Sequence, residues 1–281
     1  MSTWKLRYAP HLGLMSPDTP TFLHTVGSAD PVRQIDHIAE LGFAGVEDNF
    51  LKLRTPEEQA RMGKAMERHG LEMGCFANNV ETWDKPVWSV PGPESRAQLE
   101  RELRSTIEVA KRVNGTYVTT LSGAAPGVPR WAQLAAMTEH LKALAPIAEK
   151  AGIVMAIEPL NEWDWPGMLV QRVSEAHAIV QAVDSPAVRI LFDIFHVQAM
   201  DGDLIRNLER VWSWIGVLQI ADNPGRNEPG TGEVNWPHVL RWIRDRGWKG
   251  LVELEHSLSI PGQEGERAML ESLRTIDAGI G

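Results

Sequence analysis

The stretch "AGIVMAIEPLN" (residues 151–161) shows the pattern that decides the fold of this 281-residue chain. A glycine that can end a helix is followed by a short apolar run, and the run ends at polar residues. The same order returns at residues 41–49, 69–79, 113–123, 186–196, 214–222 and 248–257. Residues 4–13 contain one further apolar run. The sequence therefore predicts eight short strands at regular intervals along the chain.

Amphipathic segments separate these predicted strands. Their apolar residues recur at the spacing of one helix face, over residues 30–41, 57–69, 94–113, 131–150, 170–182 and 236–246. Several glycines stand directly after predicted helices, where a left-handed cap commonly ends a helix: Gly42, Gly70, Gly152 and Gly247. The predicted strands are continuous apolar runs, which is typical of parallel strands covered on both faces.

This repeated alternation predicts an α/β protein, a single (β/α)8 TIM barrel domain over residues 1–281. A doubly wound open sheet is the alternative. It requires a glycine-rich phosphate turn after the first strand, and "APHLGLMSPDTP" (residues 9–20) contains no G-x-G-x-x-G. No linker, low-complexity run or shift in composition divides the chain, so one domain is the simpler interpretation.

Composition and charge exclude several classes of partner. The formal net charge of −9 disfavours nucleic acid, because binding to phosphates depends on Lys and Arg. No apolar run approaches the roughly 18–20 residues of a membrane span, and the N-terminus lacks a secretory signal pattern. Cys75 is the single cysteine, which excludes an internal disulfide and fits a reducing cytoplasm. We expect a cytoplasmic protein with a small-molecule substrate. A homo-oligomer is compatible with the sequence, which does not fix the oligomeric state.

Oxygen-bearing side chains end four consecutive predicted strands: Glu158, Asp193, Gln219 and Glu255. A TIM barrel carries its chemistry at the carboxyl ends of its strands, so we expect these side chains to meet. Three gathered carboxylates repel one another unless protons or a cation intervene. A set of oxygen ligands without thiolate or imidazole favours Mg²⁺ or Mn²⁺ over Zn²⁺. Glu253 lies on the same strand face as Glu255, and we choose Glu255 because it lies at the strand end.

Four phrases resemble the hydroxypyruvate isomerases of the xylose isomerase-like TIM barrel superfamily, which contains sugar isomerases and epimerases. They are "IEPLNEWDWPG" (157–167), "LFDIFHVQAMDGDL" (191–204), "LQIADNPGRNEPGTGEVNW" (218–236) and "GLVELEH" (250–256). Over residues 1–151 the likeness rests on the strand–helix rhythm more than on motifs. The "NEWDWPG" segment is unusually rich in tryptophan, and His256 stands where an aromatic residue is expected.

The resemblance implies one divalent metal bound by Glu158, Asp193, Gln219 and Glu255. It implies Glu158 and Glu255 as the catalytic acid–base pair, with His196 and Arg226 as substrate contacts. The related ketose 3-epimerases usually carry histidine at the place of Gln219, which favours the isomerase branch. The resemblance thus implies a role in carbohydrate metabolism, as an intramolecular oxidoreductase of the aldose–ketose type.

The same residues support a proton-transfer mechanism on chemical grounds. An α-hydroxycarbonyl compound can chelate a cation through two neighbouring oxygens, and the cation stabilises the enediolate that forms when the carbon-bound proton leaves. Return of the proton to the neighbouring carbon isomerises hydroxypyruvate or a related short 2-oxo acid. Delivery to the opposite face by a second carboxylate would make the protein a ketose 3-epimerase. A polyol dehydratase, which is a lyase, fits the same metal site.

Arg226 lies in the glycine-punctuated loop "PGRNEPGTG" (residues 224–232). Its planar guanidinium suits a substrate carboxylate. The alternative is an arginine that staples the loop through Asp222 or Glu228. His196 likewise has an alternative role, in which it orients Asp193 or Glu158.

Other candidates for the substrate pocket follow the first and fifth predicted strands. They are His11, Asp164, Trp163 and Trp165. A metal-dependent DNA-repair nuclease of the same superfamily would need more histidine ligands and a basic face. A sugar-binding barrel without catalytic activity would not need two glutamates beside one metal. The sequence therefore favours an enzyme.

Overall fold

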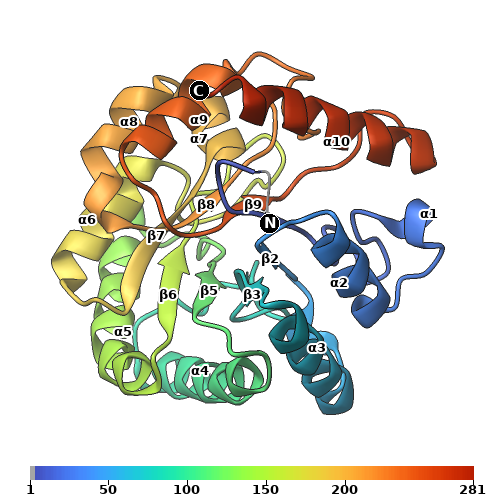
Figure 1. Cartoon of the computed structure of the whole chain (residues 1–281). Helices are drawn as coiled ribbons and strands as arrows, with labels where there is room; N and C mark the ends of the chain where they lie inside the picture. The colour runs from blue at the N-terminus through green and yellow to red at the C-terminus, as the bar shows by residue number, and fades with distance from the viewer. Residues whose placement is uncertain (1–3) are drawn as a thin grey trace.

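The computed structural model describes residues 4–281 as a ring of parallel strands surrounded by helices (Figure 1). The first three residues of the predicted domain lie outside the described part. The strands are β1 (Tyr8–Pro10), β2 (Gly45–Val46), β3 (Glu72–Met73), β4 (Phe76–Ala77), β5 (Tyr117–Thr120), β6 (Val154–Ile157), β7 (Val188–Asp193), β8 (Ile215–Gln219) and β9 (Val252–Leu254). Each lies inside one of the eight predicted strand regions, and the third region contains both β3 and β4.

The helices confirm the amphipathic segments. They are α1 (Leu23–Val26), α2 (Pro31–Glu40), α3 (Pro56–His69), α4 (Pro93–Val113), α5 (Arg130–Ala151), α6 (Val173–Val183), α7 (Ile194–Met200), α8 (Leu204–Val211), α9 (Trp236–Asp245) and α10 (Gly262–Ala278), with 3₁₀ turns η1 (Leu51–Leu53) and η2 (Trp212–Trp214). The four predicted cap glycines all have positive φ. The sequence analysis did not predict α1, α7, α8 or α10. Among residues 4–281, no helix has the length and apolar character to cross a membrane.

Backbone hydrogen bonds close the strands into a barrel. Seven strands pair in the order β1-β9-β8-β7-β6-β5-β4, and β2 pairs with β3. The amide of Glu47 donates to the carbonyl of Pro10 at 3.0 Å, which joins the β2 end to β1. The amide of Gly74 donates to the carbonyl of Val46 at 2.7 Å, which ties β3 to β2. The chain therefore has the predicted (β/α)8 architecture.

The third strand position is interrupted between β3 and β4 by a side chain from the opposite wall. Glu253 on β9 accepts a hydrogen bond from the amide of Cys75 through Oε1 at 2.7 Å. A Cβ atom on Gly74 would lie only 2.5 Å from the same oxygen, so this residue must be small. The carboxylate takes the place of a strand–strand hydrogen bond and splits the third strand in two.

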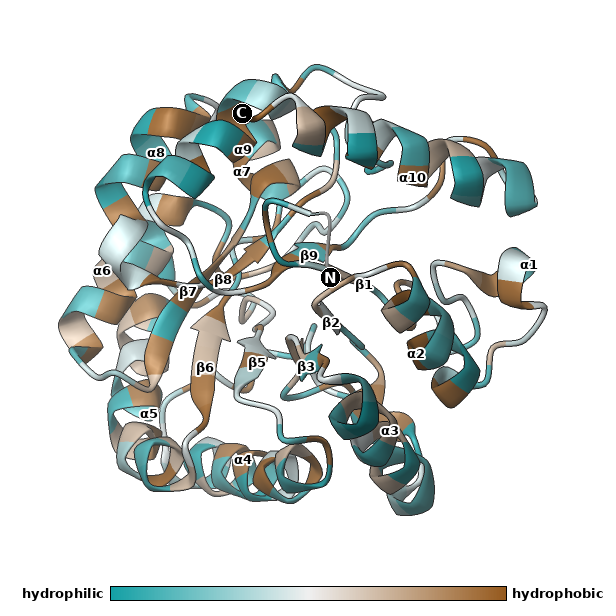
Figure 2. Cartoon of the chain, viewed as in Figure 1, coloured by the Kyte–Doolittle hydropathy of each residue, from teal (hydrophilic) through white to brown (hydrophobic). Residues whose placement is uncertain are grey.

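The barrel interior changes from apolar to polar toward the carboxyl ends of the strands. Cys75, Ala156, Leu191 and Val217 form a small buried cluster inside the barrel. Side chains alternate between the two faces of a strand, so the residues two positions later also point inward. Those residues are Ala77, Glu158, Asp193 and Gln219, of which the last three are polar. Figure 2 shows hydrophobic strands inside a shell of helices whose outer surfaces are hydrophilic.

Gly63 in α3 should be required for the contact between α3 and α4. Alanine in place of a helical glycine ordinarily stabilises a helix by about 1 kcal/mol. Here a Cβ atom would lie 2.0 Å from the carbonyl oxygen of Arg112, at the end of α4. We therefore expect Gly63→Ala to lower the free energy of unfolding by about 1–3 kcal/mol in chemical denaturation. The neighbouring Lys64→Ala is the control, with an expected change within about 0.5 kcal/mol. A stabilised Gly63→Ala protein would contradict this packing.

Candidate active site

The four predicted ligands lie at the carboxyl end of the barrel. Asp193 and Gln219 are the last residues of β7 and β8 and face each other across the strand ladder. Glu158 follows β6 directly, and Glu255 follows β9 directly. All four side chains are buried. The parallel register therefore brings these residues, spread over 98 positions of sequence from 158 to 255, to one edge of the barrel.

Several oxygens at this edge are buried without a hydrogen-bond partner. They are Glu158 Oε1, Asp193 Oδ2 and Gln219 Oε1. Burial and then the Glu255 carboxylate raise the pKa of Glu158 well above its usual range, and the same two causes raise the pKa of Asp193 to about 7. Unpaired buried acceptors are costly, and a bound cation would satisfy them.

The charges at the site match a dication. With Glu158, Asp193 and Glu255 all ionised, as metal ligands must be, these carboxylates and the guanidinium of Arg226 would sum to a charge of −2 (−3 + 1). Ligand atoms of Glu158, Asp193 and His196 lie within 4.8 Å of one another, so this buried group could hold a metal ion. The residues present therefore fit a divalent cation in both charge and unpaired acceptors.

His196 brings a buried ring nitrogen without a hydrogen-bond partner, Nε2, to this site. The backbone amide of Asn161 donates to its Nδ1 at 3.1 Å, so that nitrogen carries a lone pair. Burial, followed by the nearby Arg226, lowers the pKa of His196 well below its usual range, and the ring is neutral. Its proton is therefore on Nε2, which lies 3.4 Å from Asp193 Oδ2 and 3.7 Å from Glu158 Oε1. A protonated nitrogen does not ligate a metal, and Nε2–H instead points at the oxygens around the site.

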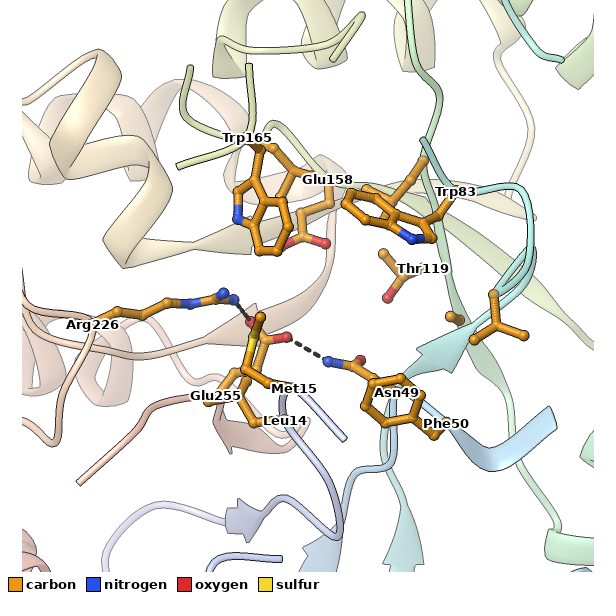
Figure 3. Close-up of a pocket in the computed structure, with 14 residues that line it drawn as sticks. Leu14, Met15, Asn49, Phe50, Trp83, Thr119, Glu158, Trp165, Arg226 and Glu255 are labelled. Carbon is orange, nitrogen blue, oxygen red and sulfur yellow. Dashed lines mark hydrogen bonds and ion pairs between the residues drawn. The ribbon is translucent and has the colours of Figure 1, made fainter. Parts of the chain in front are cut away.

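Glu255 is held by two donors from different loops. The Nη2 atom of Arg226 lies 2.7 Å from Glu255 Oε2, and Asn49 Nδ2 donates to Oε1 at 2.7 Å (Figure 3). Asn49 was not among the predicted site residues, although it directly follows the second predicted strand in "GVEDN" (residues 45–49). The two charge-assisted contacts fix the Glu255 carboxylate toward the cavity.

Arg226 does not staple its loop. Its side chain contacts neither Asp222 nor Glu228, and it lies 5.6 Å from the centre of the Phe195 ring. Asp222 performs the stapling. Its carboxylate accepts hydrogen bonds from the amides of Asn223, Gly230 and Val234 and from the indole of Trp236. Arg226 itself has a φ of +52° and its carbonyl accepts from Ser257, which anchors it beside β9.

A second layer of carboxyl groups orients Gln219. The Nε2 atom of this amide donates to Glu47 Oε2 at 3.2 Å and to Glu253 Oε2 at 3.1 Å. Both amide hydrogens are therefore used below the site, and Oε1 is left for the site itself. Burial, then the Glu253 carboxylate, raises the pKa of Glu47, and burial raises the pKa of Glu253 to about 7. The sequence places Glu253 on the same strand face as Glu255, but its pattern does not predict this role.

The remaining predicted pocket residues divide into one that lines the cavity and three that do not. Trp165 lines it. Trp163 is 74% exposed, and Asp164 accepts a hydrogen bond from Asn161 Nδ2 at 2.9 Å within its own turn. His11 is buried and lies 3.1 Å from the carbonyl of His256 through Nε2. Trp163, Asp164 and His11 thus do not line this cavity, and their contacts with a substrate stay predictions.

A cavity of about 310 Å³ opens beside these groups. Figure 3 draws Trp165 and Trp83 along one side of it with Glu158 beside them, and Met15 and Glu255 along the opposite side. Trp83 was not predicted, because it lies in a connection without a periodic pattern. The cavity therefore brings charged and aromatic side chains together.

Comparison with known proteins identifies the family to which this barrel belongs. A model of the xylose isomerase-like TIM barrel family matches residues 35–278. The chain belongs to the xylose isomerase-like TIM barrel family. The match covers more than three quarters of the chain, from α2 to α10, and so includes every residue of the charged cluster. The family resemblance predicted from four sequence phrases is confirmed.

Two proteins whose sequences are similar to this chain are named as isomerases. Hydroxypyruvate isomerase from Escherichia coli (strain K12) is 29% identical over 248 residues, which covers 86% of this chain and 94% of that protein. The 2-oxo-tetronate isomerase from Cupriavidus necator is 28% identical and covers 76% of this chain and 82% of that protein. This chain is similar to both over most of its length.

Among solved structures, a family 2 AP endonuclease from Brucella melitensis superimposes with a TM-score of 0.75 at 26% identity. The similarity covers 92% of this chain and 96% of that one. The present chain carries a formal charge of −9, which does not suit a surface that binds nucleic acid. The similarity establishes a shared barrel.

Removal of the Asp222 carboxylate should loosen the loop that carries Arg226. Asp222→Ala leaves three backbone amides and one buried indole without their acceptor, so we expect the free energy of unfolding to fall by about 3 kcal/mol. Asp245→Ala, which removes an exposed ion pair with Arg244, is the control and should change it by less than about 1 kcal/mol. Equal effects of the two substitutions in chemical denaturation would refute this role of Asp222.

Proposed function

We propose that the protein is an isomerase of short α-hydroxy-oxo acids that moves a proton between two neighbouring carbons. The observation that carries this proposal is the buried group of unpaired oxygens on Glu158, Asp193 and Gln219, next to the Nε2–H of His196 and the fixed carboxylate of Glu255. The names of the hydroxypyruvate isomerase and 2-oxo-tetronate isomerase relatives support the same reaction class.

Glu158, Asp193, Gln219 and Glu255 would hold one Mg²⁺ or Mn²⁺, because hard cations prefer oxygen ligands. When bound, the cation would supply Lewis-acid stabilisation of negative charge on the substrate oxygens. His196 is left out of the ligand set, because its Nε2 carries a proton. The orientation of Gln219 supports this assignment, since its amide nitrogen is already bound to Glu47 and Glu253.

Glu158 and Glu255 would carry out the proton transfer. In R–CH(OH)–CO–COO⁻, one carboxylate of the pair Glu158 and Glu255 takes the proton from C3 and returns it to C2. The hydroxyl proton passes from the C3 oxygen to the C2 oxygen, which gives R–CO–CH(OH)–COO⁻. The Nε2–H of His196, which lies 3.7 Å from Glu158 Oε1 and 3.4 Å from Asp193 Oδ2, would orient these carboxylates. No external oxidant or reductant is consumed.

Arg226 would recognise the substrate carboxylate. Its guanidinium lines the cavity, and only Nη2 is engaged by Glu255. A guanidinium has five N–H donors, so it can bridge Glu255 and a substrate carboxylate. This contact would place the carboxylated end of the substrate beside Glu255.

Ketose 3-epimerisation and polyol dehydration are the alternatives on the same residues. An epimerase would deliver the proton to the opposite face of the same carbon, and a dehydratase would expel a hydroxyl group. The engagement of Arg226 with the cavity favours a substrate with a carboxylate, which free ketoses lack. We also propose that residues 1–281 work as one domain in the cytoplasm. A homo-oligomer is compatible with this proposal.

The assay that tests the function uses protein freed of metal by a chelator. We expect metal-free protein to leave hydroxypyruvate unchanged and added Mg²⁺ or Mn²⁺ to restore isomerisation, with deuterium from D₂O appearing at the reacting carbon. Free ketohexoses should react at least tenfold more slowly, measured as kcat/KM. Faster turnover of ketohexoses would favour the epimerase alternative, and full activity after complete metal removal would refute the metal assignment.

Substitution of the acid–base pair should remove turnover and keep the fold. We expect Glu158→Gln and Glu255→Gln each to lower kcat by about 100-fold or more, because the amide cannot accept the carbon-bound proton. Circular dichroism and thermal unfolding report the fold. Glu162→Gln, in the exposed part of the loop after β6, is the matched control and should keep its activity. Wild-type turnover by Glu158→Gln or Glu255→Gln would exclude that glutamate from the chemistry.

A further inference from the structure

The cavity beside Glu158, Arg226 and Glu255 is lined by more apolar than polar residues. Nine of its fourteen lining residues are apolar, among them Leu14, Val80, Trp83, Leu121 and Trp165. Its charged lining residues are Glu158, Arg226 and Glu255. Trp165 and Trp83 lie beside Glu158 in Figure 3, so the atoms of a substrate that extend beyond the charged groups meet apolar side chains.

The uncharged polar side chains of the cavity are already engaged. Asn49 donates to Glu255, and the Oγ1 atom of Thr119 lies 2.9 Å from the Sγ atom of Cys75 in a hydrogen bond. The indoles of Trp83 and Trp165 offer only N–H donors. Apart from Glu158 and Glu255, the lining side chains provide only Asn49 Oδ1 and Thr119 Oγ1 as oxygen acceptors for a chain of substrate hydroxyls. Hydroxyl groups buried there without partners would lower the affinity.

The cavity also has space for a group larger than hydroxypyruvate, and Trp83 and Trp165 give part of its wall a defined shape. A water molecule occupies about 30 Å³ of liquid, so the 310 Å³ cavity corresponds to roughly ten waters, more space than hydroxypyruvate fills. Trp83, from the connection after β4, and Trp165, from the loop after β6, meet edge to face with centroids 5.1 Å apart at 87°. Two such rings form a corner that an alkyl or aryl group can fill.

We propose that the site accepts 3-hydroxy-2-oxo acids whose distal group R is a branched alkyl or an aryl group, in preference to a hydroxylated chain. The inference rests on the proposed function and names its substrate class. The C3–H bond breaks, the C2–H bond forms, and the hydroxyl proton passes from the C3 oxygen to the C2 oxygen. R takes no part in the chemistry and binds in the corner of Trp83 and Trp165.

The first test compares kcat/KM of the wild-type protein, supplied with Mg²⁺ or Mn²⁺, for R = H, hydroxymethyl, isopropyl and benzyl. We expect the isopropyl and benzyl substrates to exceed the hydroxymethyl substrate by about tenfold or more, the gain typical of added apolar atoms in a fitted pocket. A hydroxymethyl substrate that equals or exceeds both would overturn the inference, while turnover of hydroxypyruvate would leave the proposed function standing.

A second test measures binding without turnover. The 2-hydroxy acids R–CH₂–CH(OH)–COO⁻ lack the hydroxycarbonyl pair and cannot isomerise. Calorimetry should show the benzyl compound binding at least tenfold more tightly than the hydroxymethyl compound. Tighter binding of the benzyl compound by a protein that isomerises none of the oxo acids would uphold the apolar selection and refute the proposed function. Equal binding of the two would overturn the apolar selection.

A substitution locates the selectivity. Trp83→Ala should lower the ratio of kcat/KM for the benzyl substrate to that for hydroxypyruvate by at least fivefold. Trp131→Ala removes a tryptophan that is 74% exposed and outside the cavity lining, and it should leave this ratio unchanged. An unchanged ratio in Trp83→Ala would show that the corner of Trp83 and Trp165 does not bind R. If this variant does not fold, the comparison of the four substrates with the wild-type protein still tests the proposal.

Discussion

Three buried carboxylates with a single guanidinium among them set the main constraint on this molecule. Glu158, Asp193 and Glu255 lie at one end of the barrel, where low solvent access strengthens their repulsion. Arg226 offsets one charge and leaves two. A protein that kept this arrangement only for stability would do better with apolar residues. The cost of the cluster is therefore consistent with a site that binds a cation and moves protons.

The surroundings of the cluster are arranged to fix the direction of each polar atom. The backbone of Asn161 leaves the His196 proton on Nε2, and the carboxyl groups of Glu47 and Glu253 leave the Gln219 oxygen unpaired. Each of these contacts uses the atom that points away from the site. Pre-oriented groups of this kind need little reorganisation when charge develops on a substrate.

The cavity separates two kinds of recognition. Its charged residues would hold the reacting carbons and the carboxylate, which are common to all α-hydroxy-oxo acids. Its aromatic side chains, Trp83 and Trp165, would contact the substituent R attached to the reacting carbons. Such a division lets members of one barrel family share their chemistry and differ in the substituent they accept, because the wall residues come from loops and the charged residues from strand ends.

The sequence by itself determined the barrel and the inward face of its strand ends. Short apolar runs that end at polar residues, alternating with amphipathic helices, are local patterns, so they identified Glu158, Asp193, Gln219 and Glu255 as one edge. Only the tertiary structure decided which atoms meet. The pairing of Arg226 with Glu255, the tautomer of His196 and the wall made by Trp83 depend on contacts between loops distant in sequence. Side-chain direction in loops is set by such contacts and carries no periodic signal.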